Sequence, residues 1–139
     1  MLDLTALERA VAAFEAVLER TEDPALNARL DVVTRNALRA GAIQHFEFTY
    51  ELAWKFIRRW LAEQLGKDYV LGVTRRELFR LAAEHGLIGD VDAWMRFHRA
   101  RNLTSHTYNE TVAREIYASA RDFLPHAARL LRRLRERND

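Results

Sequence analysis

The segment Phe46–Leu61, with the sequence FEFTYELAWKFIRRWL, is unusually apolar for a stretch with helical periodicity. Its apolar side chains recur every three or four residues on two faces of one α-helix: Phe46, Tyr50, Ala53, Ile57 and Leu61 on the first face, and Phe48, Leu52 and Phe56 on the second. A helix that is apolar on two sides needs cover on both. We therefore expect this helix to lie at the centre of a helical bundle or to be shared with a second subunit.

The helix that contains this segment is predicted to run from Pro24 to Leu65. Asp23 is a suitable capping residue and proline is favoured at the first helical position, while Gly66 marks the end. Gly41 weakens a helix interior by about 1 kcal/mol relative to alanine, so we expect a bend or break near this residue.

Four further helices are indicated by capping signals and apolar stripes. The pattern Thr5–Glu8 has the form of a capping box and opens a helix over the first twenty residues, and Thr74–Glu77 repeats the pattern before a short helix that stops at His85–Gly86. Asp90 can cap the next helix, and a last helix is expected from Glu110 to Arg137. With only two prolines and five glycines, the chain is predicted to be all-α, an antiparallel four-helix-type bundle that forms a single domain over residues 1–139.

The composition excludes several kinds of site. The chain has no cysteine, so disulfides and zinc–thiolate centres are impossible. The histidines His45, His85, His98 and His126 do not have the spacing of metal ligands. We expect neither a metal site nor a cofactor. No apolar run approaches the ~18 residues that a membrane span needs, and the first residues lack a signal-peptide pattern, so a cytoplasmic protein without membrane contact is predicted.

One polar segment, Arg101–Tyr108, interrupts the amphipathic pattern between the last two predicted helices. Its sequence RNLTSHTY contains several good capping residues, but helix caps do not require an arginine, a histidine and a tyrosine as well. Histidine can take or give a proton near neutral pH, and arginine can stabilise charge on a pentacoordinate phosphate. In RNA the attacking 2′-hydroxyl belongs to the substrate, so no metal is strictly needed. One chain lacks a second nearby histidine to protonate the leaving group, and a symmetric dimer would supply it.

Arg101, His106 and Tyr108 reproduce the R-x4-H-x-Y motif of the HEPN-domain proteins, and the chain resembles the HepT-like branch of that family. The resemblance extends to the helical block Ala42–Lys55, to Gly86–Ile88 and to the residues around the motif, and it covers about residues 3 to 134. The motif alone is a weak signal, whereas the motif with two long flanking blocks is specific.

The resemblance implies a helical bundle that forms a homodimer and is encoded beside a minimal nucleotidyltransferase. Members with an intact motif resemble metal-independent ribonuclease toxins that act on RNA, and the nucleotidyltransferase acts as an antitoxin by adenylylating the motif tyrosine. Carried over to this sequence, Arg101 and His106 would be catalytic, Asn102 a supporting polar residue and Tyr108 the site of modification.

Several alternatives remain at this point. The chain can instead be a non-catalytic subunit that presents substrate to the nucleotidyltransferase, as early descriptions of the family had it, or a purely structural dimerisation module. Arg101 can serve in an ion pair with Glu47 or Glu51, His106 can cap a helix, and Tyr108 can be a buried ring with a satisfied hydroxyl.

Overall fold

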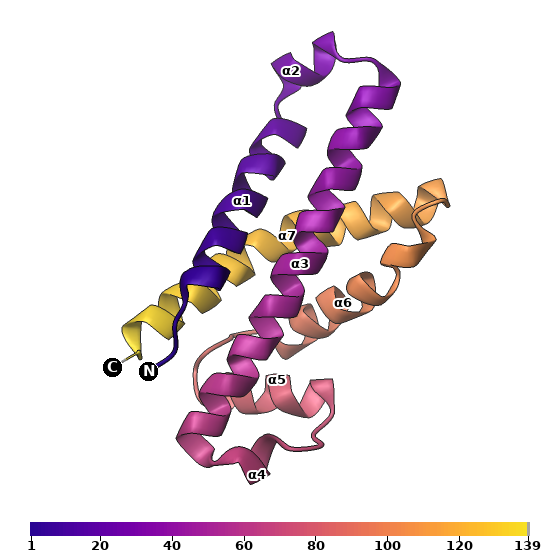
Figure 1. The fold of residues 1–139 in the computed structure, drawn as a ribbon. Helices are drawn as coiled ribbons and strands as arrows, with labels where there is room; N and C mark the ends of the chain where they lie inside the picture. The colour runs from indigo at the N-terminus through magenta and orange to yellow at the C-terminus, as the bar shows by residue number, and fades with distance from the viewer. Residues whose placement is uncertain (139) are drawn as a thin grey trace.

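The computed structural model describes residues 1–138, which form helices and no β-strand (Figure 1). In chain order the elements are α1 (Thr5–Thr21), α2 (Pro24–Arg29), α3 (Val32–Leu65), α4 (Lys67–Val70), α5 (Arg75–Glu84), α6 (Val91–Asn102), the 3-10 helix η1 (Thr104–His106) and α7 (Glu110–Glu136). The predicted all-α class is confirmed. No helix within this range is long and apolar enough to cross a membrane.

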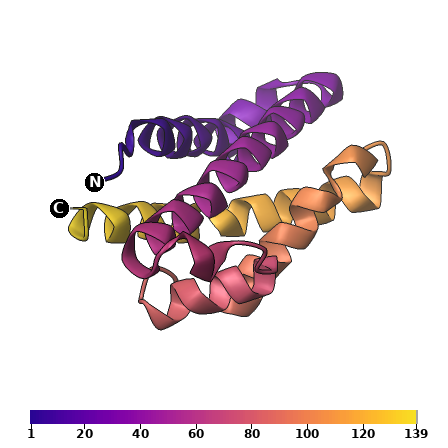
Figure 2. The same ribbon diagram turned by 60° about the horizontal axis from the view of Figure 1, so that its bottom comes forward.

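Four long helices build the body of the protein. α1 and α3 lie side by side and run in opposite directions, and α6 and α7 form a second antiparallel pair (Figures 1 and 2). α3 packs against α1, α6 and α7, which is the central position predicted from its apolar faces. The antiparallel four-helix-type bundle is therefore confirmed, with α2 as a connection between α1 and α3, and α4 and α5 between α3 and α6.

Most helix starts follow the predicted capping signals. The side chains of Asp23, Thr74 and Asp90 each accept hydrogen bonds from backbone N–H groups in the first turn of the following helix. At the other end of α5, Gly86 adopts a φ of 76°, a left-handed conformation that glycine enters without steric cost.

The capping box predicted at Thr5 is wrong. Thr5 is the first residue of α1 rather than its cap, and both its backbone N–H and its hydroxyl donate to the carboxylate of Asp3, at 3.0 and 2.6 Å. A carboxylate is a stronger acceptor than a hydroxyl, so Asp3 takes over the stabilisation that the hydroxyl was expected to provide.

The predicted break near Gly41 is also wrong, because the interruption lies ten residues earlier. Leu30 is extended, with φ −97° and ψ 147°, and Asp31 caps α3 by accepting from the backbone N–H of Thr34 at 2.7 Å. α3, which is 34 residues long, runs through Gly41 without a break. Asp31 starts a new helix after the extended Leu30, a second start that the apolar pattern of residues 24–65 does not mark. The helix penalty of one glycine, about 1 kcal/mol, is too small to interrupt this helix at Gly41.

The two apolar faces of α3 differ in their cover. All five residues of the first face are buried, but the second face is divided: Phe56 is 2% exposed, whereas Phe48 is 61% exposed. One chain thus covers the first face completely and leaves Phe48 in solvent, beside the polar segment described next.

Candidate functional site

The polar segment occupies the junction between α6 and α7. Arg101 and Asn102 lie in the last turn of α6, His106 ends η1, and Asn109 caps α7 by accepting from the backbone N–H of Val112. The predicted polar break after Asn102 is confirmed, and the capping residues of this segment account for only part of its polar side chains.

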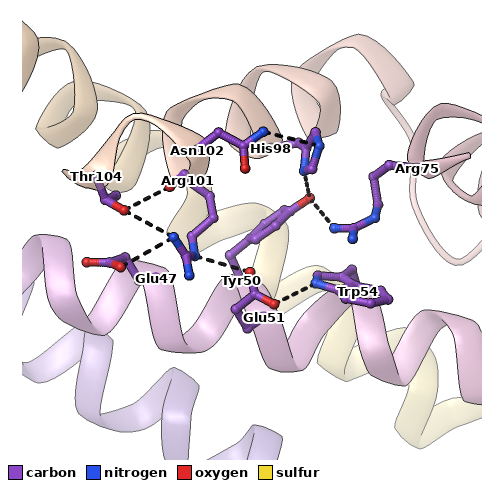
Figure 3. Close-up of polar contacts among 9 residues, drawn as sticks. All are labelled: Glu47, Tyr50, Glu51, Trp54, Arg75, His98, Arg101, Asn102 and Thr104. Carbon is purple, nitrogen blue, oxygen red and sulfur yellow. Dashed lines mark hydrogen bonds and ion pairs between the residues drawn. The ribbon is translucent and has the colours of Figure 1, made fainter. Parts of the chain in front are cut away.

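The Arg101 guanidinium reaches across to two carboxylates on α3 (Figure 3). Its Nη1 lies 3.5 Å from Glu47 Oε2 and its Nε lies 3.1 Å from Glu51 Oε1. Thr104 completes the arrangement, because its hydroxyl accepts from Arg101 Nη1 at 3.1 Å and donates to the Arg101 carbonyl at 2.8 Å. The ion pair that the sequence offered as an alternative role for Arg101 is therefore present.

This ion pair does not use the full hydrogen-bonding capacity of Arg101. The Nε atom is buried yet makes no hydrogen bond, so its short contact with Glu51 is an ion pair without a well-aligned N–H. The side chain remains 32% exposed and lines an open groove of about 520 Å³, together with Gln44, His45, Glu47, Phe48 and Glu51. An anion entering the groove would meet one edge of a positioned guanidinium.

His106 and Tyr108 form a separate exposed pair. Their rings meet edge to face with centroids 5.9 Å apart, and the Tyr108 hydroxyl lies 3.5 Å from His106 Nδ1. Tyr108 is 85% exposed, so the alternative of a buried ring is wrong. Within residues 1–138, no hydrogen bond joins this pair to Arg101. The structure thus brings the four predicted residues to one junction, but Arg101 and the pair of His106 and Tyr108 have separate partners, and Asn102 contacts His98.

Asn102 belongs to a polar network that the sequence did not predict. Arg75 Nη1 donates to the Tyr50 hydroxyl at 3.0 Å, the hydroxyl lies 2.9 Å from His98 Nδ1, and His98 Nε2 lies 3.5 Å from the Asn102 amide (Figure 3). Because arginine can only donate, the Tyr50 oxygen accepts from Arg75, and the contact between the Tyr50 hydroxyl and His98 Nδ1 holds one proton, donated by whichever of the two groups carries it. The Asn102 amide nitrogen is the atom that faces His98 Nε2, and the direction of this contact follows from the His98 tautomer and the orientation of the amide.

The protonation states in this network follow from burial. Tyr50 is fully buried, and loss of solvation raises the pKa of its phenol above the ordinary value, so the hydroxyl stays protonated. Burial, with Arg75 nearby, lowers the pKa of His98, which keeps the ring neutral. The sequence pattern predicts only a core position for Tyr50, on the first apolar face of α3. A buried tyrosine needs a hydroxyl partner, but only the folded chain identifies it.

The start of α7 is tied to α3 by a forked ion pair. Arg39 Nη1 and Nη2 lie 2.7 and 2.9 Å from the two carboxylate oxygens of Glu110, and hydrogen bonding from Arg39 lowers the pKa of that carboxyl to about 2. This contact restrains the junction that carries His106 and Tyr108 from its far end. Among the described residues, no group of three or more histidine, aspartate or glutamate side chains is arranged to hold a metal ion.

Comparison with known proteins identifies the class to which this fold and junction belong. A family model described as "nucleotidyltransferase substrate binding protein like" matches residues 2–136, so the chain belongs to this family. It is 36% identical over 138 residues to a protein of Haemophilus influenzae named probable ribonuclease HepT, an alignment that covers 99% of this chain and 94% of the relative. The resemblance found in the sequence is confirmed.

Two solved structures share the fold. One, from Haemophilus influenzae and described as the fold of a substrate-binding domain of a nucleotidyltransferase, has a TM-score of 0.91 at 34% identity and covers 96% of this chain and 99% of that one. The other, from Thermus thermophilus, has a TM-score of 0.70 at 34% identity and covers 93% of this chain and 98% of that one.

Proposed function

We propose that this protein is a HepT-type ribonuclease toxin that cleaves RNA without a metal ion and is controlled by a minimal nucleotidyltransferase. The observation that carries the proposal is the exposed junction at which Arg101, held by Glu47 and Glu51, and the accessible pair of His106 and Tyr108 occur together. The relative named probable ribonuclease HepT supports the same chemistry.

The reaction needs only groups that the substrate and these side chains contain. The 2′-oxygen of a ribose attacks the adjacent phosphorus, the bond from phosphorus to the 5′-oxygen breaks, and the products carry a 2′,3′-cyclic phosphate and a free 5′-hydroxyl. A histidine takes the proton of the 2′-hydroxyl, and a second acid gives a proton to the departing 5′-oxygen. The guanidinium of Arg101 stabilises the extra negative charge on the phosphorane.

The second proton carrier is the reason for proposing a homodimer. His98, on the helix that carries Arg101, has both ring nitrogens directed at Tyr50 and Asn102, so it is poorly placed to exchange protons with a substrate. A twofold axis near the α6–α7 junction would bring two copies of His106 to one phosphate, one as base and one as acid. Asn102 would then support the geometry of this shared site.

Wild-type protein incubated with single-stranded RNA in excess EDTA is expected to cleave at the same rate as in Mg²⁺, because the nucleophile is the ribose itself. The products are identified by the cyclic phosphate, which resists phosphatase until acid opens it. Cleavage that stops on chelation, or that leaves a 5′-phosphate, would contradict the proposed mechanism.

Tyr108 is the proposed point of control by the nucleotidyltransferase. Its exposed hydroxyl is accessible to an adenylyl donor, and the added phosphate would place negative charge beside His106 and repel the substrate. Tyr108→Phe is expected to remain active and to escape inactivation when the partner enzyme and ATP are present. Intact-protein mass spectrometry of wild type and variant checks this. An adenylyl group that still appears on the variant would assign the modification to another residue.

A non-catalytic role as the substrate-binding subunit of the nucleotidyltransferase is the second candidate. It is supported by the family description and by the open groove of about 520 Å³ beside Arg101, which has room for a small ligand. Wild-type protein that binds a nucleotide but cleaves no RNA would favour this role over the first.

A further inference from the structure

Three cationic side chains surround the indole of Trp54, on the face of the molecule that also carries Arg101. The Arg75 guanidinium carbon lies 3.6 Å from the ring centroid, that of Arg58 lies 4.9 Å away, and Lys55 Nζ lies 5.8 Å away. We name Lys55, Arg58 and Arg75 the Trp54 cation cluster. They come from α3 and from the first residue of α5, so the cluster exists only in the folded chain.

The Trp54 cation cluster has a surplus of charge. Within residues 1–138, no carboxylate lies within 4.0 Å of any of its three cationic groups, although nine such ion pairs occur elsewhere. Stacking on an aromatic ring stabilises one cation by about 0.5–2 kcal/mol, but it does not remove the repulsion among three. An anion placed among them would do so.

The shape of the surface beside the cluster suits such an anion. A hollow of about 300 Å³ is lined by Arg58, Arg75 and Thr74, with Trp54, Val70 and Leu78 as apolar walls. Arg75 uses one N–H for Tyr50, stacks on Trp54 and also lines this hollow. The combination of guanidinium donors, a hydroxyl and an aromatic surface is typical of proteins that bind single-stranded nucleic acid.

The cluster lies next to the proposed cleavage site. Glu51 contacts both: its Oε1 lies 3.1 Å from Arg101 Nε, and its Oε2 accepts from Trp54 Nε1 at 3.0 Å. Figure 3 shows Arg101 on one side of Glu51, with Trp54 and Arg75 on the other. A short step along a nucleic acid backbone therefore leads from the Arg101 groove to the cluster.

We propose that the Trp54 cation cluster binds the backbone phosphates of the RNA strand that continues from the scissile phosphate at Arg101. This inference rests on the proposed ribonuclease function and adds to it a second contact region, one that holds the strand without reading its sequence. Glu51 lies between the two regions and repels phosphate, so neighbouring phosphates of the strand are held on either side of it, at Arg101 and at the cluster.

The test uses a fluorescein-labelled single-stranded RNA of mixed sequence and the His106→Ala background, in which the strand should stay intact. Binding is measured by anisotropy as a function of salt concentration. The double variant Lys55→Ala/Arg58→Ala removes two charges and leaves the Arg75–Tyr50 hydrogen bond in place. Its slope of log affinity against log salt is expected to fall by about 0.7 for each RNA phosphate that the variant no longer neutralises.

The matched control is Arg29→Ala/Arg59→Ala. It removes the same charge from exposed positions, one on α2 and one on α3 adjacent in sequence to Arg58, where the guanidinium lies over Phe56 instead of Trp54. Its slope is expected to match that of the background protein. Circular dichroism establishes that both doubles are folded, and light scattering compares their oligomeric state with that of wild type.

Three results would overturn the inference. Equal slopes for the cluster double and the background, or an equal decrease in both doubles, would show that the Trp54 cation cluster makes no local contact with phosphate. Wild-type cleavage of RNA would in that case still support the proposed function. A changed oligomeric state in the cluster double alone would assign these residues to a protein interface. Wild-type protein that neither binds nor cleaves RNA would remove the proposed function and this inference together.

Discussion

Replacing His106 with alanine is expected to reduce RNA cleavage about 10²- to 10⁴-fold, the usual contribution of a positioned acid or base, and to abolish growth inhibition when the protein is expressed. If one phosphate uses two copies of this histidine, both proton transfers are lost together, so the upper part of the range is expected. The ring is exposed and lies against Tyr108, so the free energy of unfolding should change by less than about 0.5 kcal/mol.

The control is His85→Ala, which removes a histidine at the end of α5, outside the polar junction, where the ring lies against Trp60. This variant should cleave RNA at the wild-type rate. Cleavage and toxicity retained by a folded His106→Ala protein would exclude His106 as the proton carrier, and would exclude the proposed mechanism with it.

The same variant tests whether the site is shared between two subunits. Exchange of wild-type protein with an excess of His106→Ala should reduce the wild-type activity well below its value after simple dilution, because most wild-type chains then face a defective partner. Activity that is unaffected by the mixing would indicate that each chain works alone.

The largest loss of stability is expected for Phe123→Ala, at about 3–5 kcal/mol. Phe123, on α7, is fully buried and is the centre of the aromatic core. Its ring centroid lies 5.1–6.3 Å from those of five other rings contributed by the three other long helices: Phe14 of α1, Phe46 and Tyr50 of α3, and Trp94 and Phe97 of α6. Truncation leaves a cavity where all four long helices meet.

Urea denaturation followed by circular dichroism, at one protein concentration for all variants, measures this loss. Phe48→Ala makes the same chemical change at a side chain that is 61% exposed, and within one chain it should cost far less. A cost below about 1 kcal/mol for Phe123→Ala would mean that the core closes around the cavity or that α7 is not required for the packing of the other three helices.

The Phe123 variant also connects the core to the proposed site. The Tyr50 ring packs against Phe123 while its hydroxyl joins Arg75 and His98. A cavity at Phe123 gives the Tyr50 ring freedom to move, so folded Phe123→Ala protein should also lose part of the order around Asn102.

Much of this fold could be predicted from local chemistry. The stripe at a period of 3.6 residues identifies the buried face of α3, and Asp23, Thr74 and Asp90 mark helix starts, because each signal acts within one or two turns. The errors at Thr5 and Gly41 have the same origin. In each case an aspartate, Asp3 or Asp31, provides the cap that the pattern placed elsewhere or did not include, and local patterns do not rank several acceptable capping residues.

The sequence by itself determined the helical class, the central position of Phe46–Leu61 and the identity of the polar segment from Arg101 to Tyr108, since these depend on periodicity and residue type alone. The tertiary structure decided which groups meet. Arg101 forms ion pairs with Glu47 and Glu51 on α3, about fifty residues earlier in the chain. The Tyr50 hydroxyl contacts Arg75 and His98, and three cationic groups lie around Trp54. The physical reason is that ion pairs and hydrogen bonds extend only a few ångströms, and distances between helices are set by the packing of the whole core.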